Sequence, residues 1–476
     1  MRHSSGNSVR RLPIGNGLKL MSSTPSLALK SAAGISGWLR SPPAPRPSLE
    51  QDLRADVVIV GAGYNGLSAA LELRARGIDP VVLERDFAGS GASGRNAGYL
   101  ASGSGLEFGL IISKLGRGGA EALVRFYDEA VRHVETLFAR LNIKCDYTPS
   151  GIIAAAIHPA QESRVRHQVE IGRELGTPVR FLAQDEMRAR GIPSAFLCGA
   201  FSETGGTLDP GKYVLGLRQA ALDAGVRLFE NSAVTSIEDG APVRVRTERG
   251  SVVADACILA TNAYSPSLGF LSNKVIPIRV SAIETEPLTG RQREALGWPN
   301  REGIVTAHYV MESHRLTSRN TLLISTKRID YPYSSVAREH PDSSAYAVLE
   351  AALRERLPEV GDVPVSYRWN GWVTFSGDTI PVVGNEGSHR NILYSSGCSG
   401  HGLATQTLMG VLLAERACGR EHEWESIFRR KVPRLPPEPL RWTACKLLLG
   451  TARLLDGRVD RKARRLGTTW QKRFSL

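Results

Sequence analysis

The feature that most constrains this chain is a buried strand followed at once by a glycine loop and a helix. Val57–Val60 is a short continuous apolar run, which is typical of a parallel strand covered on both faces. The sequence GAGYNG follows at 61–66, apolar residues at helical spacing continue to Gly77, and a second short strand ends at Glu84. This complete strand–loop–helix–strand unit predicts a domain that binds a dinucleotide.

Three glycines and one acid in this unit have distinct physical roles. Gly61 permits the tight turn, and Gly63 lets the backbone approach a pyrophosphate. Gly66 lets the helix pack closely on the sheet, and the helix N-terminus presents unpaired amides to the phosphates. Glu84 can accept hydrogen bonds from ribose hydroxyls, which disfavours the phosphorylated ribose of NADP. The unit alone leaves FAD and NAD open.

Two further segments are rich in small residues. Ser90–Gly98 places Arg95 and Asn96 where they could serve phosphate and ring-edge contacts. A strand at 391–394 leads into the glycine loop 395–402 and then into a helix. A second helix N-terminus of this kind could point at the electron-rich edge of a reduced flavin.

Charge and cysteine usage exclude several classes of partner. The net charge is +13, but residues 1–50 carry +6, residues 427–476 carry +11 and the body carries −4. We therefore expect no basic groove through the core and no nucleic-acid partner. The six cysteines form no CxxC and no Cys/His cluster with zinc spacing, which predicts reduced thiols, a cytoplasm-like compartment and no metal site.

The two ends of the chain differ from the body. Residues 1–50 are basic, Ser-rich and almost free of acids, which is typical of an organelle-targeting segment or of a disordered extension. Residues 427–476 form a basic tail with an amphipathic helix beginning at Leu440. This helix either docks on the protein's own surface or makes peripheral contact with an anionic membrane, where it would deliver electrons to a membrane acceptor. No run of eighteen apolar residues indicates a transmembrane helix.

Taken together, the motifs resemble the D-amino-acid oxidase superfamily of FAD-dependent oxidoreductases. The similarity is greatest to its gamma-glutamylputrescine oxidase-like and sarcosine oxidase-like members. The matching segments are 56–66, SGRNAG at 93–98, 258–264, Trp372 with 379–384, and SGHG at 399–402.

The resemblance implies an α/β fold, α+β overall, with a Rossmann-like FAD-binding domain interleaved with a mixed-sheet substrate domain. The FAD-binding domain would combine 53–104, 204–272 and 368–424. The substrate domain would combine 105–203 and 273–367. The residue pattern itself agrees in part with this implied fold. It predicts helices at 119–141, 160–176 and 211–224 and a hairpin that turns at Gly250.

The resemblance also implies the chemistry. An amine or amino acid would be oxidised at its C–N bond to an imine, water would hydrolyse the imine, and oxygen, a quinone or another acceptor would reoxidise the flavin. The implied FAD contacts are Gly61, Gly63, Gly66, Glu84, Arg85, Ser93, Arg95, Asn96, Gly98, Val234, Thr261, Gly397, Gly400 and Gly402. We expect noncovalent FAD, because 370–374 has no cysteine and 90–98 has no histidine where relatives link the flavin.

Five side chains are candidates for catalysis or substrate binding. His401 could tune the flavin or meet substrate, or bond only to backbone. Lys327 could help oxygen react with reduced flavin, as a lysine does in some relatives. Tyr264 and Trp372 line the substrate cavity or pack in the core, and Arg315 either pairs with a substrate carboxylate or lies on the surface. No catalytic base is assigned.

Several other functions remain open from the sequence. Within the superfamily, the alternatives are a D-amino-acid dehydrogenase and a sarcosine-type demethylating oxidase. A tRNA-modifying flavoprotein is disfavoured by the charge of the body. A non-catalytic flavin-binding partner is disfavoured because both glycine loops are intact, and a nicotinamide reductase would need a second GxGxxG after a strand.

Overall fold

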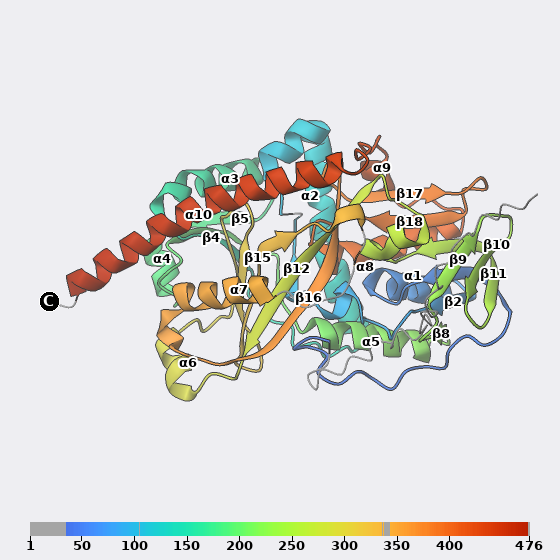
Figure 1. Cartoon of the computed structure of the whole chain (residues 1–476), viewed down its shortest axis with the longest axis horizontal. Coiled ribbons are helices and arrows are strands. Elements are labelled where there is room, and N and C mark those ends of the chain that lie inside the picture. The colour runs from blue at the N-terminus through green and yellow to red at the C-terminus, as the bar shows by residue number, and fades with distance from the viewer. Residues whose placement is uncertain (1–34, 104, 336, 338–342, 475–476) are drawn as a thin grey trace, which may run out of the picture.

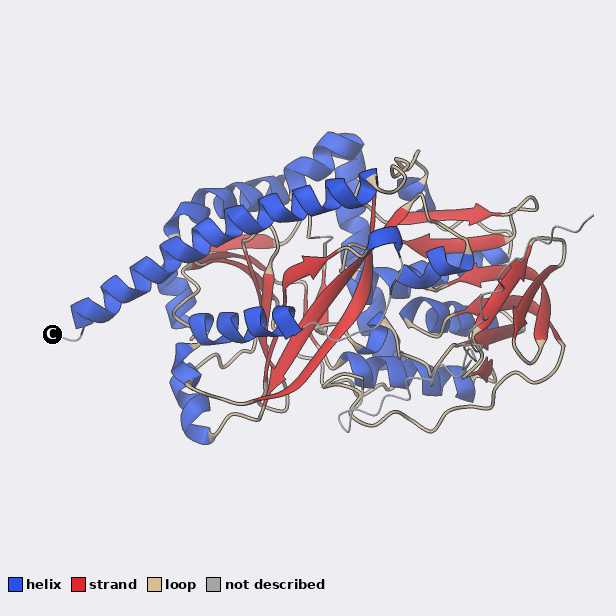
Figure 2. Cartoon of the chain, in the orientation of Figure 1, coloured by secondary structure: helices blue, strands red, loops and turns tan. Residues whose placement is uncertain are grey.

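Two eight-stranded sheets organise the molecule and occupy its two ends (Figure 1). The computed structural model describes residues 35–103, 105–335, 337 and 343–474. Helices pack on both sheets (Figure 2), so the fold is of the mixed α/β class that the sequence predicts.

The first sheet is built on the buried strand before the glycine loop. β1 (Leu53–Val60) lies between β2 (Pro80–Leu83) and β11 (Ser251–Leu259), and all three are parallel. The strand order is β17-β18-β11-β1-β2-β8, and β10 and β9 extend from β11 as an antiparallel ribbon. The chain thus leaves β1 toward β2 on one side and reaches β11 on the other, which is where doubly wound sheets bind ligands. The other strands are β8 (Arg227–Phe229), β9 (Val234–Glu238), β10 (Val243–Thr247), β17 (Val382–Glu386) and β18 (Ile392–Ser396).

Four helices share one apolar core with this sheet: α1 (Tyr64–Ala75), α2 (Phe108–Arg140), α5 (Pro210–Asp223) and α8 (Gly402–Ala417). The position of α2 corrects the expected assignment of 105–203 to the substrate domain, because its apolar side chains pack beside those of α1 and α8. α2 also begins before the predicted 119, and it is interrupted at Gly116, where φ is 69°.

The second sheet is mixed and has the order β16-β12-β15-β14-β13-β4-β6-β5. Only the β13–β4 pair is parallel. Its strands are β4 (Ile152–Ala156), β5 (Val179–Leu182), β6 (Cys198–Ser202), β12 (Val275–Thr285), β13 (Gly303–Thr306), β14 (Glu312–Leu316), β15 (Leu322–Asp330) and β16 (Val365–Ser376). β16 pairs with β12 as far as Ser376, so the expected domain boundary at 367/368 cuts through a continuous strand.

Shorter elements complete the fold. Helices on the second-sheet side are α3 (Glu162–Glu174), α4 (Gln184–Ala189), α6 (Gly290–Leu296) and α7 (Ser343–Arg356), and α9 spans Glu425–Phe428. β3 (Tyr99–Ala101) and β7 (Gly205–Thr207) form a separate two-stranded sheet. Single 3-10 turns span Ala92–Gly94, Pro159–Gln161, Asn262–Leu268, Tyr333–Ser335 and Pro358–Val360.

Residues 35–52, just before β1, do not form the unfolded extension that the composition of 1–50 predicts. This segment packs on the body, and Trp38, Leu39 and Leu49 are buried. The Trp38 indole donates to the carbonyl of Asn96 over 2.8 Å, and the Ser36 hydroxyl donates to that of Gly94 over 2.7 Å. The rest of the proposed targeting segment lies outside the described residues.

The C-terminal tail forms one long helix, α10 (Leu440–Phe474), which extends well beyond the predicted amphipathic stretch. It runs along the second-sheet half of the molecule (Figure 1), where Val459 and Ala463 join the apolar core of that sheet. In the part of the chain that the structure describes, no helix is both long and apolar enough to cross a membrane.

Candidate functional site: a dinucleotide cradle between two glycine loops

The loop between β1 and α1 is shaped by close approaches that only glycine permits. Gly61 has φ of 104°, and its N–H donates to the Leu83 carbonyl over 2.8 Å. A Cβ at Gly66 would lie 2.0 Å from the carbonyl oxygen of Gly61, and a Cβ at Gly63 would lie 2.8 Å from Oγ of Ser93. Gly63 caps α1 without a side chain, so the first turn is open to an anion.

Glu84 lies at the carboxyl end of β2 beside this loop. One carboxylate oxygen accepts the Ala62 N–H over 2.8 Å, and the other accepts the Asp86 N–H over 3.1 Å. Burial raises the pKa of Glu84, although these two backbone donors oppose the shift. The carboxylate is therefore held in a fixed orientation at the position where a dinucleotide presents its ribose hydroxyls.

The small-residue segment 90–98 wraps against the start of α1. Ser93 Oγ accepts the Tyr64 N–H over 3.0 Å, and the Asn96 amide donates to the Tyr64 hydroxyl over 3.0 Å. Arg95 donates to the carbonyls of Ser90 and Asn370, which ties the segment to β16. Gly98, with φ of 75°, donates its N–H to the Asn96 side-chain oxygen.

The second glycine loop, 397–402, lies against the same region. The Thr374 hydroxyl accepts the Gly397 N–H over 2.9 Å and donates to the Asn262 side-chain oxygen over 2.8 Å. The Asn65 amide, in the first turn of α1, donates to Oγ of Ser395 over 2.9 Å. The loop continues into α8, whose N-cap makes no side-chain capping bond. The structure thus brings the start of α1 close to the loop that leads into α8, and the direction of the α8 N-terminus toward a flavin stays a prediction.

His401 is partly buried in this loop. Its Nδ1 lies 3.1 Å from the Ser399 carbonyl, and a Cβ at Gly105 would lie 2.3 Å from its ring. Burial lowers the pKa of His401, so the imidazole is neutral at pH 7. The neighbouring Cys398 is buried, which raises the pKa of its thiol to about 11.

The remaining predicted residues divide between the two sides of the site. The Arg85 guanidinium lies 4.6 Å from the centroid of the Tyr264 ring, so these two predicted residues are neighbours. Thr261 bonds Ser265 over 2.8 Å just after β11, and Val234 is half-buried at the start of β9. Trp372 is buried on β16, and its indole N–H has no hydrogen-bond partner among the described residues.

Arg315 is buried rather than on the surface. Its Nη1 donates to the carbonyls of Ala97, Gly98 and Leu208 at 2.7, 3.1 and 2.8 Å. Its guanidinium also lies 5.1 Å from the Trp38 ring. Arg315 therefore holds the backbone after the SGRNAG segment through Nη1, while its Nε has no hydrogen-bond partner among the described residues. The surface alternative is wrong, and pairing with a substrate carboxylate stays a prediction.

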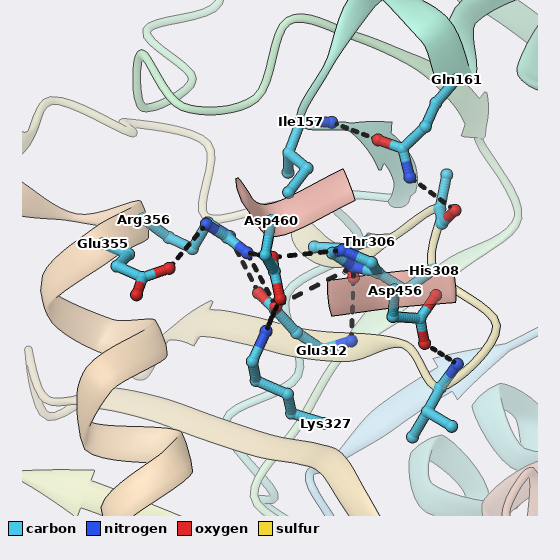
Figure 3. Close-up of polar contacts among 12 residues, drawn as sticks. Ile157, Gln161, Thr306, His308, Glu312, Lys327, Glu355, Arg356, Asp456 and Asp460 are labelled. Atoms are coloured by element: carbon cyan, nitrogen blue, oxygen red, sulfur yellow. Dashed lines mark hydrogen bonds and ion pairs between the residues drawn. The ribbon is translucent and has the colours of Figure 1, made fainter. Parts of the chain in front are cut away.

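Lys327 belongs to a different group of side chains (Figure 3). Its ammonium bonds Glu312 and lies 3.0 Å from Asp460 of α10, and Arg356 bonds both carboxylates. The structure thus commits Lys327 to this ion cluster and does not bring it together with the glycine loops. His308, Glu312 and Asp460 lie close enough to hold a metal ion, but the two cations already neutralise the two carboxylates.

Sequence reasoning missed the residues that join the parts of the site. Thr374 and Asn262 couple the second loop to β16 and β11, and Trp38 and Trp369 donate to the carbonyls of Asn96 and Arg95. Asn65 was within the glycine motif, where a polar residue facing a second loop could have been suspected. Trp38 gave no signal, because it stands in a Ser- and Pro-rich stretch that is typical of disorder.

The observed geometry fits a bound dinucleotide such as FAD. The cradle at Gly63 and Gly66 would be filled by any Cβ, and α1 and α8 both begin without a side-chain cap. Glu84 lies beside this loop at the end of β2, and the buried indole N–H of Trp372 has no hydrogen-bond acceptor among the described residues.

Comparison with known proteins agrees with this geometry. Residues 56–416 match the family model DAO, FAD dependent oxidoreductase. Gamma-glutamylputrescine oxidoreductase of Escherichia coli K12 is 31% identical over 389 residues, which cover 80% of this chain and 88% of the relative. Sarcosine oxidase subunit beta of Rhodobacter capsulatus is 23% identical, covering 73% of this chain and 80% of the relative.

Solved structures show the same fold. Glycine oxidase from Geobacillus kaustophilus superposes with a TM-score of 0.65 at 21% identity, covering 78% of this chain and 96% of that one. L-proline dehydrogenase from P. horikoshii gives a TM-score of 0.66 at 18% identity, covering 79% and 98%. Because the family model matches residues 56–416 and a relative is 31% identical over 80% of the chain, the chain belongs to the DAO family of FAD-dependent oxidoreductases.

Proposed function

We propose that the protein oxidises the C–N bond of an amine to an imine, which water then hydrolyses. The observation that carries this proposal is the bond from the Asn65 side chain, in the first glycine loop, to Ser395 at the start of the second, which brings the two loops together. FAD, when bound, supplies the hydride acceptor. Support for an amine substrate comes from the gamma-glutamylputrescine oxidoreductase of E. coli, which is 31% identical over most of both chains.

Each part of the site has a role in this reaction. The open first turn of α1 binds the pyrophosphate and Glu84 binds the ribose. The partial positive charge at the N-terminus of α8 would stabilise negative charge on a bound flavin. His401 is neutral and positions its loop rather than carrying a positive charge. We expect FAD to be held noncovalently, because 370–374 has no cysteine and 90–98 has no histidine, and the Cys398 thiol is buried.

The three backbone contacts of Arg315 Nη1 support an amine substrate over an amino acid. An amino-acid substrate is commonly held by a charge-assisted bond from an arginine to its carboxylate. Arg315 was the candidate for that contact, and its Nη1 is instead bonded to three backbone carbonyls. D-amino-acid dehydrogenation and sarcosine-type demethylation are the second candidates, supported by the relatives that bear sarcosine and glycine oxidase names.

An anaerobic absorbance titration of the purified protein tests the proposal. Gamma-glutamylputrescine, putrescine, sarcosine, glycine, L-proline and D-alanine would each be added without oxygen. We expect an amine to bleach the oxidised flavin bands, and the amino acids to bleach them slowly or not at all. Bleaching by amino acids alone would overturn the amine assignment, and bleaching only by NADH or NADPH would overturn C–N oxidation altogether.

Admitting air after bleaching then identifies the electron acceptor. Rapid return of the oxidised bands supports oxygen as the acceptor. A persistently reduced flavin that is reoxidised by a soluble quinone supports a dehydrogenase.

A further inference from the structure

The helix α10 docks on the body largely through polar contacts. Asp456 accepts the backbone N–H groups of Tyr309 and Val310, each over 2.9 Å. Lys446 bonds Asp330 over 2.5 Å, and Arg441 donates to the Ser335 hydroxyl over 2.9 Å. Asp460 enters the ion cluster with Lys327 and Arg356 (Figure 3). The side of the helix that faces the protein is thus fixed mainly by charges.

The opposite side of the first half of α10 is apolar and exposed. Leu440, Leu447 and Leu454 recur every seven residues, and their exposed fractions are 64%, 70% and 68%. Leu448, also 70% exposed, is turned about 100° from Leu447 around the helix and widens the apolar surface. A surface helix normally turns its leucines inward, whereas this helix leaves four of them in water.

In the second half of α10, the side that carries the exposed leucines carries positive charges instead. Arg458, Arg461 and Lys462 are exposed there, at helical spacing from Leu454. The two acids of the helix, Asp456 and Asp460, both point to the body. The outward side of the helix therefore combines a leucine patch with a basic patch and has no acid among its described side chains.

We propose that α10 lies in the surface of an anionic membrane, with Leu440, Leu447, Leu448 and Leu454 inserted among the acyl chains and Arg458, Arg461 and Lys462 on the headgroups. An apolar stretch followed by cations is complementary to such a surface and can lie in it without crossing it. A second copy of this chain is a poorer occupant, because a two-fold contact centred on this side would face two basic patches toward each other. The proposal goes beyond the oxidation of amines and does not depend on it.

Flotation of the full-length, FAD-loaded protein with lipid vesicles tests the proposal. Vesicles of phosphatidylcholine alone would be compared with vesicles that contain phosphatidylglycerol, at low and at high salt. The leucine variant is L447Q/L448Q/L454Q, with L110Q on α2 as the control at another exposed leucine. The charge variant is R458E/R461E/K462E, with R132E/R188E/R249E as the control for an equal change in net charge at exposed sites.

We expect the protein to float with the anionic vesicles and to be released by salt. Each α10 variant should lower the vesicle partition coefficient by at least about tenfold, and the controls should change it less than about twofold. Absence of flotation, or equal loss in the control variants, would overturn the proposal. The proposal would also be overturned if the protein self-associates and the leucine variant removes this self-association but not the binding to vesicles. FAD absorbance and thermal unfolding of each variant verify that it is folded.

Discussion

The two glycine loops at the first sheet and the ion cluster beneath α10 are both buried junctions, yet opposite means hold them together. At the loops, the close approaches involve backbone atoms, such as the Gly61 N–H on the Leu83 carbonyl. In the cluster, Glu312 and Asp460 are each bonded by Lys327 and Arg356. The loops leave helix N-termini available to a ligand, whereas the charged groups of the cluster pair with one another. The buried ion cluster therefore attaches α10 to the body, whereas the glycine loops present backbone groups to a ligand.

The largest effect should follow from a side chain in the cradle. Gly61→Val places a branched residue at φ of 104° with its Cβ 2.7 Å from the Ala260 carbonyl oxygen, so the loop cannot keep its path. We expect the purified variant to contain no FAD by absorbance. Gly77→Ala is the matched control, since Gly77 has φ of 78° but no atom within 4 Å of its Cβ position. The control should retain FAD at a cost of about 1 kcal/mol in unfolding free energy. Full FAD content in Gly61→Val would contradict the cradle.

Removal of one charge from the cluster should affect stability and spare the cofactor. Asp460→Asn leaves Lys327 with Glu312 alone and Arg356 with Glu312 and Glu355, and breaking a buried pair in this way costs about 3–5 kcal/mol. Urea unfolding measures the loss, and FAD content should not change. Asp362→Asn, at a carboxylate whose side chain is 98% exposed, should change the unfolding free energy by less than about 1 kcal/mol. If the two variants lost the same unfolding free energy, the buried cluster would contribute no more to stability than an exposed ion pair.

Acid should act on the same cluster. Burial alone would raise the pKa of Glu312 and of Asp460. A hydrogen bond from His314 to Glu312, one from His308 to Asp460, and the adjacent cations outweigh burial. The pKa values of the two carboxyls therefore lie below their usual 4.5 and 3.8. In the unfolded chain these groups bind protons at higher pH, so their contribution to stability is complete above about pH 5 and is lost as pH falls. The expected loss is up to about 1.4 kcal/mol per pH unit for each carboxyl below pH 4. Urea unfolding at pH 7, 4 and 3 measures it, and Asp460→Asn should show a shallower pH dependence than the unsubstituted protein.

The smallest of these effects should appear at the ribose position. Glu84→Gln keeps the shape of the side chain but removes the charge that strengthens bonds to ribose hydroxyls, a loss of about 1.5–3 kcal/mol. The dissociation constant of FAD should therefore rise about ten- to hundredfold in a flavin fluorescence titration of the apoprotein. Asp86→Asn, at the adjacent half-exposed acid, should leave it unchanged. An unchanged constant in Glu84→Gln would show that Glu84 only braces the loop through the Ala62 N–H.

The sequence alone determined the parts of the protein whose cause is local. The strand, glycine loop and helix at 57–77, the hairpin at Gly250 and the second loop at 397–402 could be predicted, because a tight turn or close approach requires glycine within a few residues. The tertiary structure alone decided how charges and aromatic side chains are used. Lys327 and Asp460 are 133 residues apart, Trp38 and Asn96 are 58 apart, and Arg315 reaches carbonyls more than 100 residues away. A long flexible side chain can meet many partners, and which of them it meets depends on packing that no local pattern records.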